Sequence, residues 1–288
     1  MRYKGHFCKL FFLLKISKER KKHYICAQLH KLAIKQRQIS FFLNILTHIH
    51  ALHAQKRKAF AVLIDPDNVD EDACKRISLL AQENKVDFLF VGGSLLTTDN
   101  LTQTVRICKE NTTIPVVLFP ANSLHIDNQA DAILFLSLIS GRNPEFLIGQ
   151  HILAAPKLKR SNLQILPTGY ILIDTGKPTT VTYISNTTPI PYEKDSVAAC
   201  TALAGELLGL QIIYMDGGSG AEKPISQSMI KAVRQTIDVP LIVGGGINSV
   251  EKAKSALKAG ANIIVVGNAL EKSPELLKEI AFLTANFV

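Results

Sequence analysis

The stretches PLIVGGGI (240–247) and NIIVVGN (262–268) decide the fold of this chain. In each stretch a short apolar run typical of a strand ends in a glycine turn, and a helical pattern follows. Such turns leave backbone N–H groups uncovered beside a helix N-terminus, which is how α/β barrels bind phosphate. A third loop of this kind, YMDGGSG (214–220), also contains an acid, Asp216. Together the three loops predict a pocket for a phosphorylated small molecule.

Strand and helix patterns alternate along the chain from residue 59 onward. The expected strands are short and almost continuously apolar, as is typical of parallel strands covered on both faces. They span residues 59–65, 87–91, 115–119, 131–137, 170–174, 211–215, 240–243 and 262–266. Amphipathic helical patterns lie between or after them, at 70–84, 100–110, 144–154, 195–208, 225–237, 249–259 and 273–285.

Eight such strands predict a single (β/α)8 barrel, the TIM barrel. A doubly wound sheet is the alternative, but it usually carries its phosphate-binding glycines after the first strand. Here the glycines follow the sixth to eighth strands, which favours the barrel. Two connections depart from the pattern. Residues 120–130 lack a clear helix, and residues 175–194 are rich in Thr, Pro and Lys and predict an ordered loop or lid.

The N-terminal part of the chain differs in charge from the rest. Residues 1–58 hold 14 of the 33 Lys and Arg but only one of the 24 acidic residues, so the remainder is mildly acidic. A basic segment can bind nucleic acid or an anionic membrane. This segment has no recognisable binding motif, and we expect no nucleic-acid partner. Residues 1–38 are predicted to be a poorly ordered extension, and whether they belong to the natural protein stays open; the barrel domain would span 39–288, with 39–54 forming a helix that plugs its N-terminal end.

Cysteine usage and hydropathy indicate the compartment. The five cysteines, at positions 8, 26, 74, 108 and 200, include no C-x-x-C pair, which favours a reducing environment over a disulfide framework or a zinc site. No run approaches the ~18 apolar residues that a membrane-spanning helix needs. We therefore expect a soluble, cytoplasmic protein.

Polar residues at the strand ends are candidates for chemistry, because the C-terminal ends of barrel strands face the active site. Asp65 ends the first strand and Asp67 follows two residues later. Two carboxylates suit Mg²⁺, which takes one or two of them and shares its other positions with phosphate and water; alternatively, Asp67 caps the next helix. Ser94 follows Gly92 and Gly93 at the end of the second strand, where its hydroxyl could join the metal or contact a phosphate.

Two further charged residues each have two possible roles. Asp216 follows the sixth strand, where it could accept a proton from a substrate hydroxyl, or could instead accept N–H groups of its own loop. Arg142, after the fourth strand, could pair with a diphosphate or form a surface ion pair. The chain contains neither a G-x-S-x-G nucleophile elbow nor a Walker A loop.

Across residues 59–285 the chain resembles the geranylgeranylglyceryl phosphate synthase family, together with its heptaprenylglyceryl phosphate synthase relatives. The GGG and GN turns alone match many phosphate-binding barrels, whereas SGRNP (140–144) and the Y-x-D-x-G-S-G loop are more specific. The resemblance rests on the ordered set LIDPD (63–67), VGGS (91–94), LFLSLISGRNPEFLIG (134–149), PTGYILID (167–174), AGELLG (204–209), YMDGGSGA (214–221), PLIVGGGI (240–247) and VGNALE (266–271).

The resemblance implies a Mg²⁺-dependent prenyltransferase of lipid biosynthesis. Such enzymes join a polyprenyl diphosphate to the 3-hydroxyl of sn-glycerol 1-phosphate, forming an ether and releasing diphosphate. By matching motif, Asp65 and Ser94 would hold the metal and Asp216 would be the base. Glycerol phosphate would be held by Tyr214, Met215, Asp216, Gly217, Gly218, Ser219, Gly220, Gly245, Gly246, Gly267 and Asn268. The resemblance also implies a homo-oligomer, and its lipid product suggests transient contact with a membrane surface.

The chain departs from the family pattern at a few positions. Asp216 stands where Glu is frequent and is one methylene shorter, and Asn68 and Asn248 replace frequent cations near anionic ligands. The prenyl chain requires an apolar groove, expected near the third to fifth strands. Phe146 could end that groove and favour a C20 donor, geranylgeranyl diphosphate, or could be an ordinary helix-face residue. The alternative function is another phosphate-binding TIM-barrel isomerase or synthase.

Overall fold

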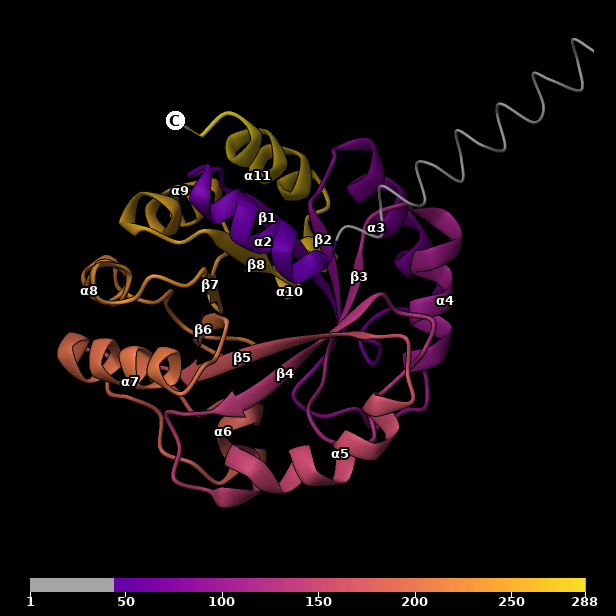
Figure 1. Cartoon of the computed structure of the whole chain (residues 1–288). Helices are drawn as coiled ribbons and strands as arrows, with labels where there is room; N and C mark the ends of the chain where they lie inside the picture. The colour runs from indigo at the N-terminus through magenta and orange to yellow at the C-terminus, as the bar shows by residue number, and fades with distance from the viewer. Residues whose placement is uncertain (1–43, 288) are drawn as a thin grey trace, which may run out of the picture. The chain divides into compact units, whose positions relative to one another are not determined.

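The computed structural model describes residues 44–287, apart from the side chains of residues 271 and 272. The predicted extension (1–38) and the first part of the predicted N-terminal helix lie outside the described residues. Eight parallel strands form a closed barrel in sequence order (Figure 1), which confirms the predicted TIM barrel. They are β1 (Ala59–Ile64), β2 (Phe88–Gly92), β3 (Val116–Phe119), β4 (Ala132–Leu138), β5 (Gln164–Leu172), β6 (Ile212–Asp216), β7 (Leu241–Gly244) and β8 (Ile263–Val266).

Helices lie outside the ring of strands and connect most of them (Figure 1). No helix among residues 44–287 is long and apolar enough to cross a membrane. The helices are α2 (Ile45–Ala54), α3 (Glu71–Glu83), α4 (Leu101–Asn111), a π-helical turn (Glu145–Gly149) leading into α5 (Gln150–Lys159), α6 (Thr180–Ser185), α7 (Asp195–Leu207), α8 (Gln227–Thr236), α9 (Val250–Ala259), α10 (Asn268–Lys272) and α11 (Glu275–Ala285).

The strands divide the core into two layers. Phe88 and Phe90 of β2 belong to the cluster inside the barrel, whereas Leu89 and Val91 pack in the cluster between strands and helices. Side chains alternate between the two faces of a strand, and here both faces are buried. This explains why the strands are almost continuously apolar in sequence.

Helix α2 plugs the N-terminal end of the barrel, as the sequence predicts. Ile45, Ile49 and Leu52 repeat at helical spacing, are buried, and belong to the cluster inside the barrel. The backbone N–H of Ile45 donates to Gln164 Oε1 at the start of β5. The open end of the barrel interior is thus closed by an apolar helix face.

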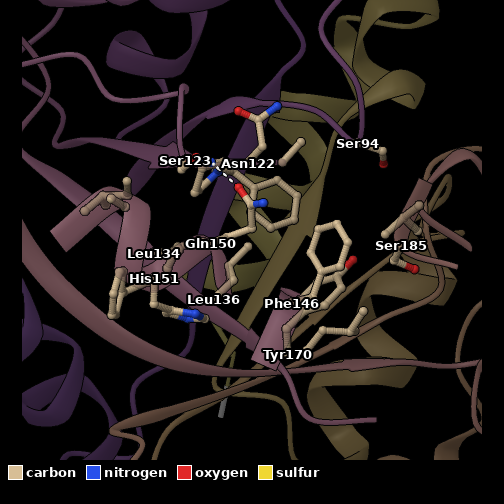
Figure 2. A pocket seen from close by; sticks show the side chains of 18 of the residues that line it. Ser94, Asn122, Ser123, Leu134, Leu136, Phe146, Gln150, His151, Tyr170 and Ser185 are labelled. Carbon is tan, nitrogen blue, oxygen red and sulfur yellow. Dashed lines mark hydrogen bonds between the residues drawn. The ribbon is translucent and has the colours of Figure 1, made fainter. Parts of the chain in front are cut away.

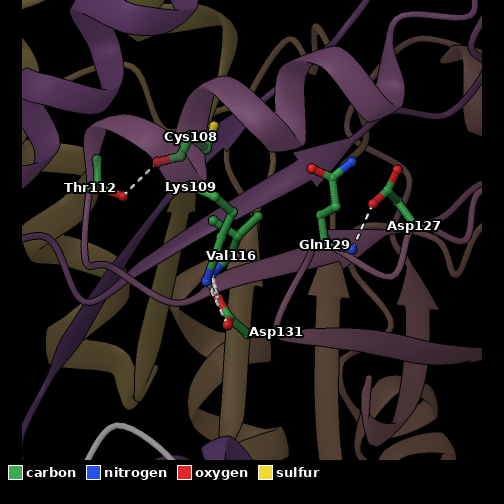
Figure 3. Close-up of polar contacts among 7 residues, drawn as sticks. All are labelled: Cys108, Lys109, Thr112, Val116, Asp127, Gln129 and Asp131. Atoms are coloured by element: carbon green, nitrogen blue, oxygen red, sulfur yellow. Dashed lines mark hydrogen bonds and ion pairs between the residues drawn. The ribbon is translucent and has the colours of Figure 1, made fainter. Parts of the chain in front are cut away.

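The connection between β3 and β4 has no helix, as the sequence predicts, and polar contacts hold it instead (Figure 3). The Asp131 carboxylate accepts the backbone N–H of Val116 at 2.8 Å and pairs with Lys109 Nζ of α4 at 2.7 Å. Asp127 Oδ1 accepts the backbone N–H of Gln129 at 2.8 Å, which turns the chain just before β4. These bonds fix the start of β4 relative to β3 and α4.

Two predicted elements differ in the structure. The fifth strand begins at Gln164, six residues before the predicted start, because Pro167 is tolerated where its carbonyl still accepts the N–H of Gln211. Glycine is required at position 169 of this strand, because a Cβ there would lie 2.9 Å from the Cδ1 methyl carbons of Ile139 and Ile213. The segment 175–194, predicted to be a loop without a helix, contains the short helix α6.

The plug can be tested with Leu52→Ala. Truncating a buried leucine removes its packing and leaves a cavity, so the free energy of unfolding should fall by about 2–5 kcal/mol. Leu207→Ala is the matched control, because Leu207 is 79% exposed. Urea denaturation measures both variants, and equal losses would show that α2 does not seal the core.

Candidate active site

The loops after β6, β7 and β8 surround one cavity of about 270 Å³ at the C-terminal end of the barrel. We call this the phosphate cup. Two residues near β1 and β2, Asp65 and Ser94, lie on its wall. The structure therefore brings together most of the residues that the sequence singled out: Tyr214, Asp216, Gly218, Ser219, Gly220, Gly245, Gly246, Gly267 and Asn268 all line this cavity.

Met215 and Gly217 are predicted substrate contacts that do not line the cup. The side chain of Met215 is fully buried in the core between strands and helices, because it lies between the inward-facing Tyr214 and Asp216 on β6. The backbone N–H of Gly217 donates to the Gly244 carbonyl at 3.1 Å. The structure assigns both residues to holding β6 and its loop in place.

Glycine is required where two loops of the cup touch. Gly245 has φ of +83°, and a Cβ there would lie 2.5 Å from the backbone nitrogen of Gly217. Across the cup, Asn268 Nδ2 donates to Ser219 Oγ at 3.0 Å, tying the loop after β8 to the loop after β6. Seven of the residues that line the cup are glycines, which allows a ligand to approach their N–H groups closely.

Helix α9 begins beside the cup and is ten residues long. Its N-cap, Ser249, accepts the N–H of Lys252 at 3.3 Å. The start of the helix carries a partial positive charge from the aligned peptide dipoles. The cup thus combines accessible backbone donors with a helix N-terminus, an arrangement that binds anions such as phosphate.

Asp216 lies at the base of the cup and is 7% exposed. Its Oδ2 accepts the hydroxyl of Tyr170 at 2.5 Å, and its Oδ1 accepts the N–H of Gly218 at 2.8 Å. Burial raises the pKa of Asp216, and the two hydrogen bonds oppose that rise. Burial and the neighbouring carboxylate raise the pKa of Tyr170 well above its usual range, so the phenol stays protonated and donates. Asp216 is therefore oriented by its neighbours and is more basic than an exposed aspartate.

Tyr170 is the site residue that sequence reasoning missed. The motif PTGYILID carries part of the family resemblance, but the strand predicted from the sequence begins at Tyr170, and the pattern gives its side chain no role. The available signal was an inward-facing tyrosine in a barrel strand, because a buried phenol needs a hydrogen-bond partner. Which acceptor it finds on β6 depends on the pairing of β5 with β6, where Tyr170 lies opposite Tyr214.

Asp65, which follows β1, provides hard oxygen donors on the wall of the cup. Its Oδ1 accepts the N–H of Asp67 at 3.1 Å and its Oδ2 accepts Asn68 Nδ2 at 3.0 Å. Burial raises the pKa of Asp65. A Cβ at Gly93 would lie 2.9 Å from Asp65 Oδ2, so glycine leaves room beside the carboxylate. One oriented carboxylate and the Ser94 hydroxyl on the same cavity are donors of the kind that Mg²⁺ takes, with phosphate and water completing its shell.

Asp67 does not cap the next helix, and its carboxylate is engaged by neighbouring threonines. Its carboxylate accepts the hydroxyl of Thr98 at 2.5 Å and the backbone and hydroxyl of Thr97 at 2.5 and 2.9 Å. Helix α3 is capped instead by Asp70, which accepts the N–H of Ala73. Asp67 does not line the cup, and the structure shows it tying the loop after β1 to the loop after β2.

An apolar cavity of about 100 Å³ adjoins the phosphate cup, at β3, β4 and β5 and under α5 and α6 (Figure 2). It lies where the sequence predicts an apolar groove. Gly93, Ser94 and Phe119 line both cavities. Its walls include Leu134, Leu136, Leu138, Phe146, Tyr170, Val181 and Ile184, with a few polar groups such as Gln150 and His151. The site is therefore a polar cup continuous with an apolar cavity.

Arg142 lines neither cavity. Its guanidinium donates to the neighbouring Gly141 carbonyl at 2.9 Å, and in the described part of the chain it takes part in no ion pair. The surface ion pair considered from the sequence is therefore absent among the described residues, and pairing with a diphosphate stays a prediction.

Comparison with known proteins gives one family. The PcrB family model matches residues 53–284. The chain is 57% identical over 231 residues to the geranylgeranylglyceryl phosphate synthase of Spirosoma linguale, covering 80% of this chain and 93% of that protein. It is 42% identical over 236 residues to the protein of the same name from Thermococcus kodakarensis, covering 82% and 92%.

A solved structure is similar as well. The (S)-3-O-geranylgeranylglyceryl phosphate synthase of Thermoplasma acidophilum, crystallised in complex with the substrate sn-glycerol-1-phosphate, superposes with a TM-score of 0.81. Its sequence is 31% identical, and the match covers 86% of this chain and 100% of that one.

The contact between the glycine loops can be tested with Gly245→Ala. The variant should weaken binding of inorganic phosphate at least about tenfold, because the new Cβ pushes the loops after β6 and β7 apart. Both Gly245 and Gly209 have positive φ, so both alanine variants carry the backbone strain of about 1 kcal/mol. A Cβ at Gly209 would contact nothing within 4 Å, so Gly209→Ala is the control. Calorimetric titration that gives both variants the wild-type affinity would contradict this role.

The effect of the Tyr170–Asp216 hydrogen bond on the pKa of Asp216 can also be tested. Tyr170→Phe removes a donor that stabilises the carboxylate, so the pKa of Asp216 should rise further and its charge should be lost at a higher pH as the solution is acidified. ¹³C NMR titration of the Asp216 carboxyl measures this. Tyr183→Phe, at an 85% exposed position, is the control. A pKa unchanged in Tyr170→Phe would show that the hydrogen bond has no energetic role.

Proposed function

This chain belongs to the PcrB family, and we propose that it is a prenyltransferase that joins geranylgeranyl diphosphate to the 3-hydroxyl of sn-glycerol 1-phosphate. The reaction forms an ether and releases diphosphate. One observation carries this proposal: a glycine-walled anion cup continues into an apolar cavity, with Asp216 in the cup and its partner Tyr170 on the apolar wall. An isomerase or synthase acting on a small polar phosphorylated substrate would need the cup but not the adjoining apolar cavity.

The phosphate of the acceptor would bind in the cup, at the loops of Gly245, Gly246 and Gly267 and the start of α9. The glycerol part would then extend toward Asp216, the acid at the base of the cup. Support comes from the similar Thermoplasma acidophilum structure, which was crystallised with sn-glycerol-1-phosphate.

The prenyl chain of the donor would occupy the apolar cavity, with its diphosphate near Gly93 and Ser94, where the two cavities meet. Phe146 lines this cavity (Figure 2) and would limit its length, which favours the C20 donor. The apolar walls stabilise the prenyl chain by keeping its surface away from water, at about 25 cal/mol per Å².

Asp65 and Ser94 would hold a Mg²⁺ ion, which would neutralise the charge that grows on the departing diphosphate. Their position on the wall of the cup, with Gly93 leaving space at the carboxylate, supports this assignment.

Asp216 would take the proton from the acceptor hydroxyl. As the hydroxyl oxygen bonds to the allylic carbon, the bond from that carbon to the diphosphate oxygen breaks and its electron pair leaves with the diphosphate. The proton passes to the Asp216 carboxylate, which Tyr170 and Gly218 hold in place. Burial, which raises the pKa of Asp216, makes it a better proton acceptor than an exposed aspartate.

The product would be an ether-linked precursor for lipid biosynthesis. We also propose that the enzyme acts in the cytoplasm, since Cys74 and Cys108 are free thiols that suit a reducing compartment. A homo-oligomer and brief contact with a membrane surface, where a prenyl lipid partitions, complete this proposal.

The test is an assay with sn-glycerol 1-phosphate, geranylgeranyl diphosphate and Mg²⁺, monitored by diphosphate release and by lipid extraction. Asp216→Asn should lower kcat by at least about 100-fold while glycerol phosphate still binds. Asp65→Asn should raise the Mg²⁺ concentration needed for half-maximal rate. Asp99→Asn, an exposed acid, is the control.

Parallel assays with farnesyl and heptaprenyl diphosphate test the expected donor length. No ether product with any donor would reject the prenyltransferase assignment, and a rate that is independent of Mg²⁺ would reject the metal site.

A further inference from the structure

The charges on the wall of the phosphate cup do not suit a phosphate by themselves. Among the described residues that line it, the charged side chains are two carboxylates, Asp65 and Asp216, and none is Lys or Arg. A phosphate monoester carries about −1.5 to −2 charges near neutral pH. A helix N-terminus contributes only about +0.5. An anion in this cup would therefore benefit from a cation that reaches it from outside the lining.

We propose that Lys252, held by Asn248, is the cation that retains the phosphate group in this cup. The proposal rests on the proposed function and adds a binding residue to it. Lys252 Nζ donates to Asn248 Oδ1 at 2.7 Å, and Asn248 lines the cup directly after the Gly245-Gly246-Ile247 turn. The ammonium group is thus folded back from the first turn of α9 to a residue on the rim of the cup.

The position of Lys252 on its helix also supports a role in anion binding. It lies three residues after the N-cap Ser249, in the first turn of α9, where the helix dipole disfavours a cation. None of the ion pairs in residues 44–287 involves Lys252. An anion bound at the start of α9 would convert this unfavourable placement into a favourable one, because the ammonium would then face a negative charge.

A second lysine near the cup is engaged elsewhere. A Cβ at Gly246 would lie 2.7 Å from the Lys223 carbonyl oxygen, so the backbone of Lys223 packs against the cup. Its ammonium, however, lies 3.6 Å from the centre of the Tyr192 ring, within cation–π distance. Among the side chains that the structure describes, Lys252 is the lysine whose ammonium donates to a side chain lining the cup.

Lys252 would contact the phosphate and not the reacting hydroxyl, so it should affect binding more than the chemical step. Lys252→Met should raise the Kd for inorganic phosphate and for sn-glycerol 1-phosphate about tenfold and leave kcat at saturating acceptor within about twofold. Asn248→Ala should raise both Kd values about threefold or more. Combined with Lys252→Met it should add little, because the two residues act as one unit.

The experiment titrates the full chain with each anion by calorimetry, at several salt concentrations. Lys254→Met is the matched control, since Lys254 is exposed two residues further along the same helix, and it should keep the wild-type Kd. Lys252→Arg keeps the charge and should restore most of the affinity. Thermal unfolding of each variant establishes that it is folded.

Wild-type affinity for both anions in Lys252→Met, or equal losses in Lys252→Met and Lys254→Met, would overturn the proposal. Failure of the proposed function has a different signature. If the chain binds phosphate through Lys252 but forms no ether lipid, prenyl transfer is rejected and the role of Lys252 stands.

Discussion

The pairing of β8 with β1 is the interaction on which the rest of the site depends. In this pairing Val62 lies opposite Val266, which closes the barrel. The loop after β1, which carries Asp65, and the loop after β8, which carries Gly267, therefore end on the same cavity although they are some 200 residues apart in the chain. Strand closure thus places the Asp65 carboxylate on the same cavity as the glycine loop after β8.

Parallel closure also explains how one protein can bind a polar and an apolar group side by side. All eight strands end on the same face of the barrel, so each connecting loop can specialise without disturbing the core. The loops after β6 to β8 are short and glycine-rich and expose backbone N–H groups. The connections around β3 to β5 instead contribute aromatic and aliphatic side chains, and residues such as Phe119 belong to both surfaces.

Two opposing effects set the charge state of Asp216, which lies where the polar cup meets the apolar cavity. Full burial would favour the neutral acid, and the donors Tyr170 and Gly218 restore stability to the charged form. The carboxylate is therefore held in one orientation and kept basic at the same time. The neighbouring aromatic rings of Phe119, Tyr170 and Tyr214 pack against one another and exclude water from this region.

The sequence by itself determined the barrel, the order of its strands and most of the cup, because apolar runs, glycine turns and caps act through local chemistry. The strand pattern predicts a start for β5 that is too late. The cost of Pro167 and Gly169 within a strand depends on what packs beside them, and the sequence does not show those neighbours. Only the tertiary structure decided that Met215 faces away from the cup, that Asp67 ties two loops, and that Tyr170 holds Asp216. Those outcomes depend on strand register and on contacts between residues distant in the chain, which no local pattern specifies.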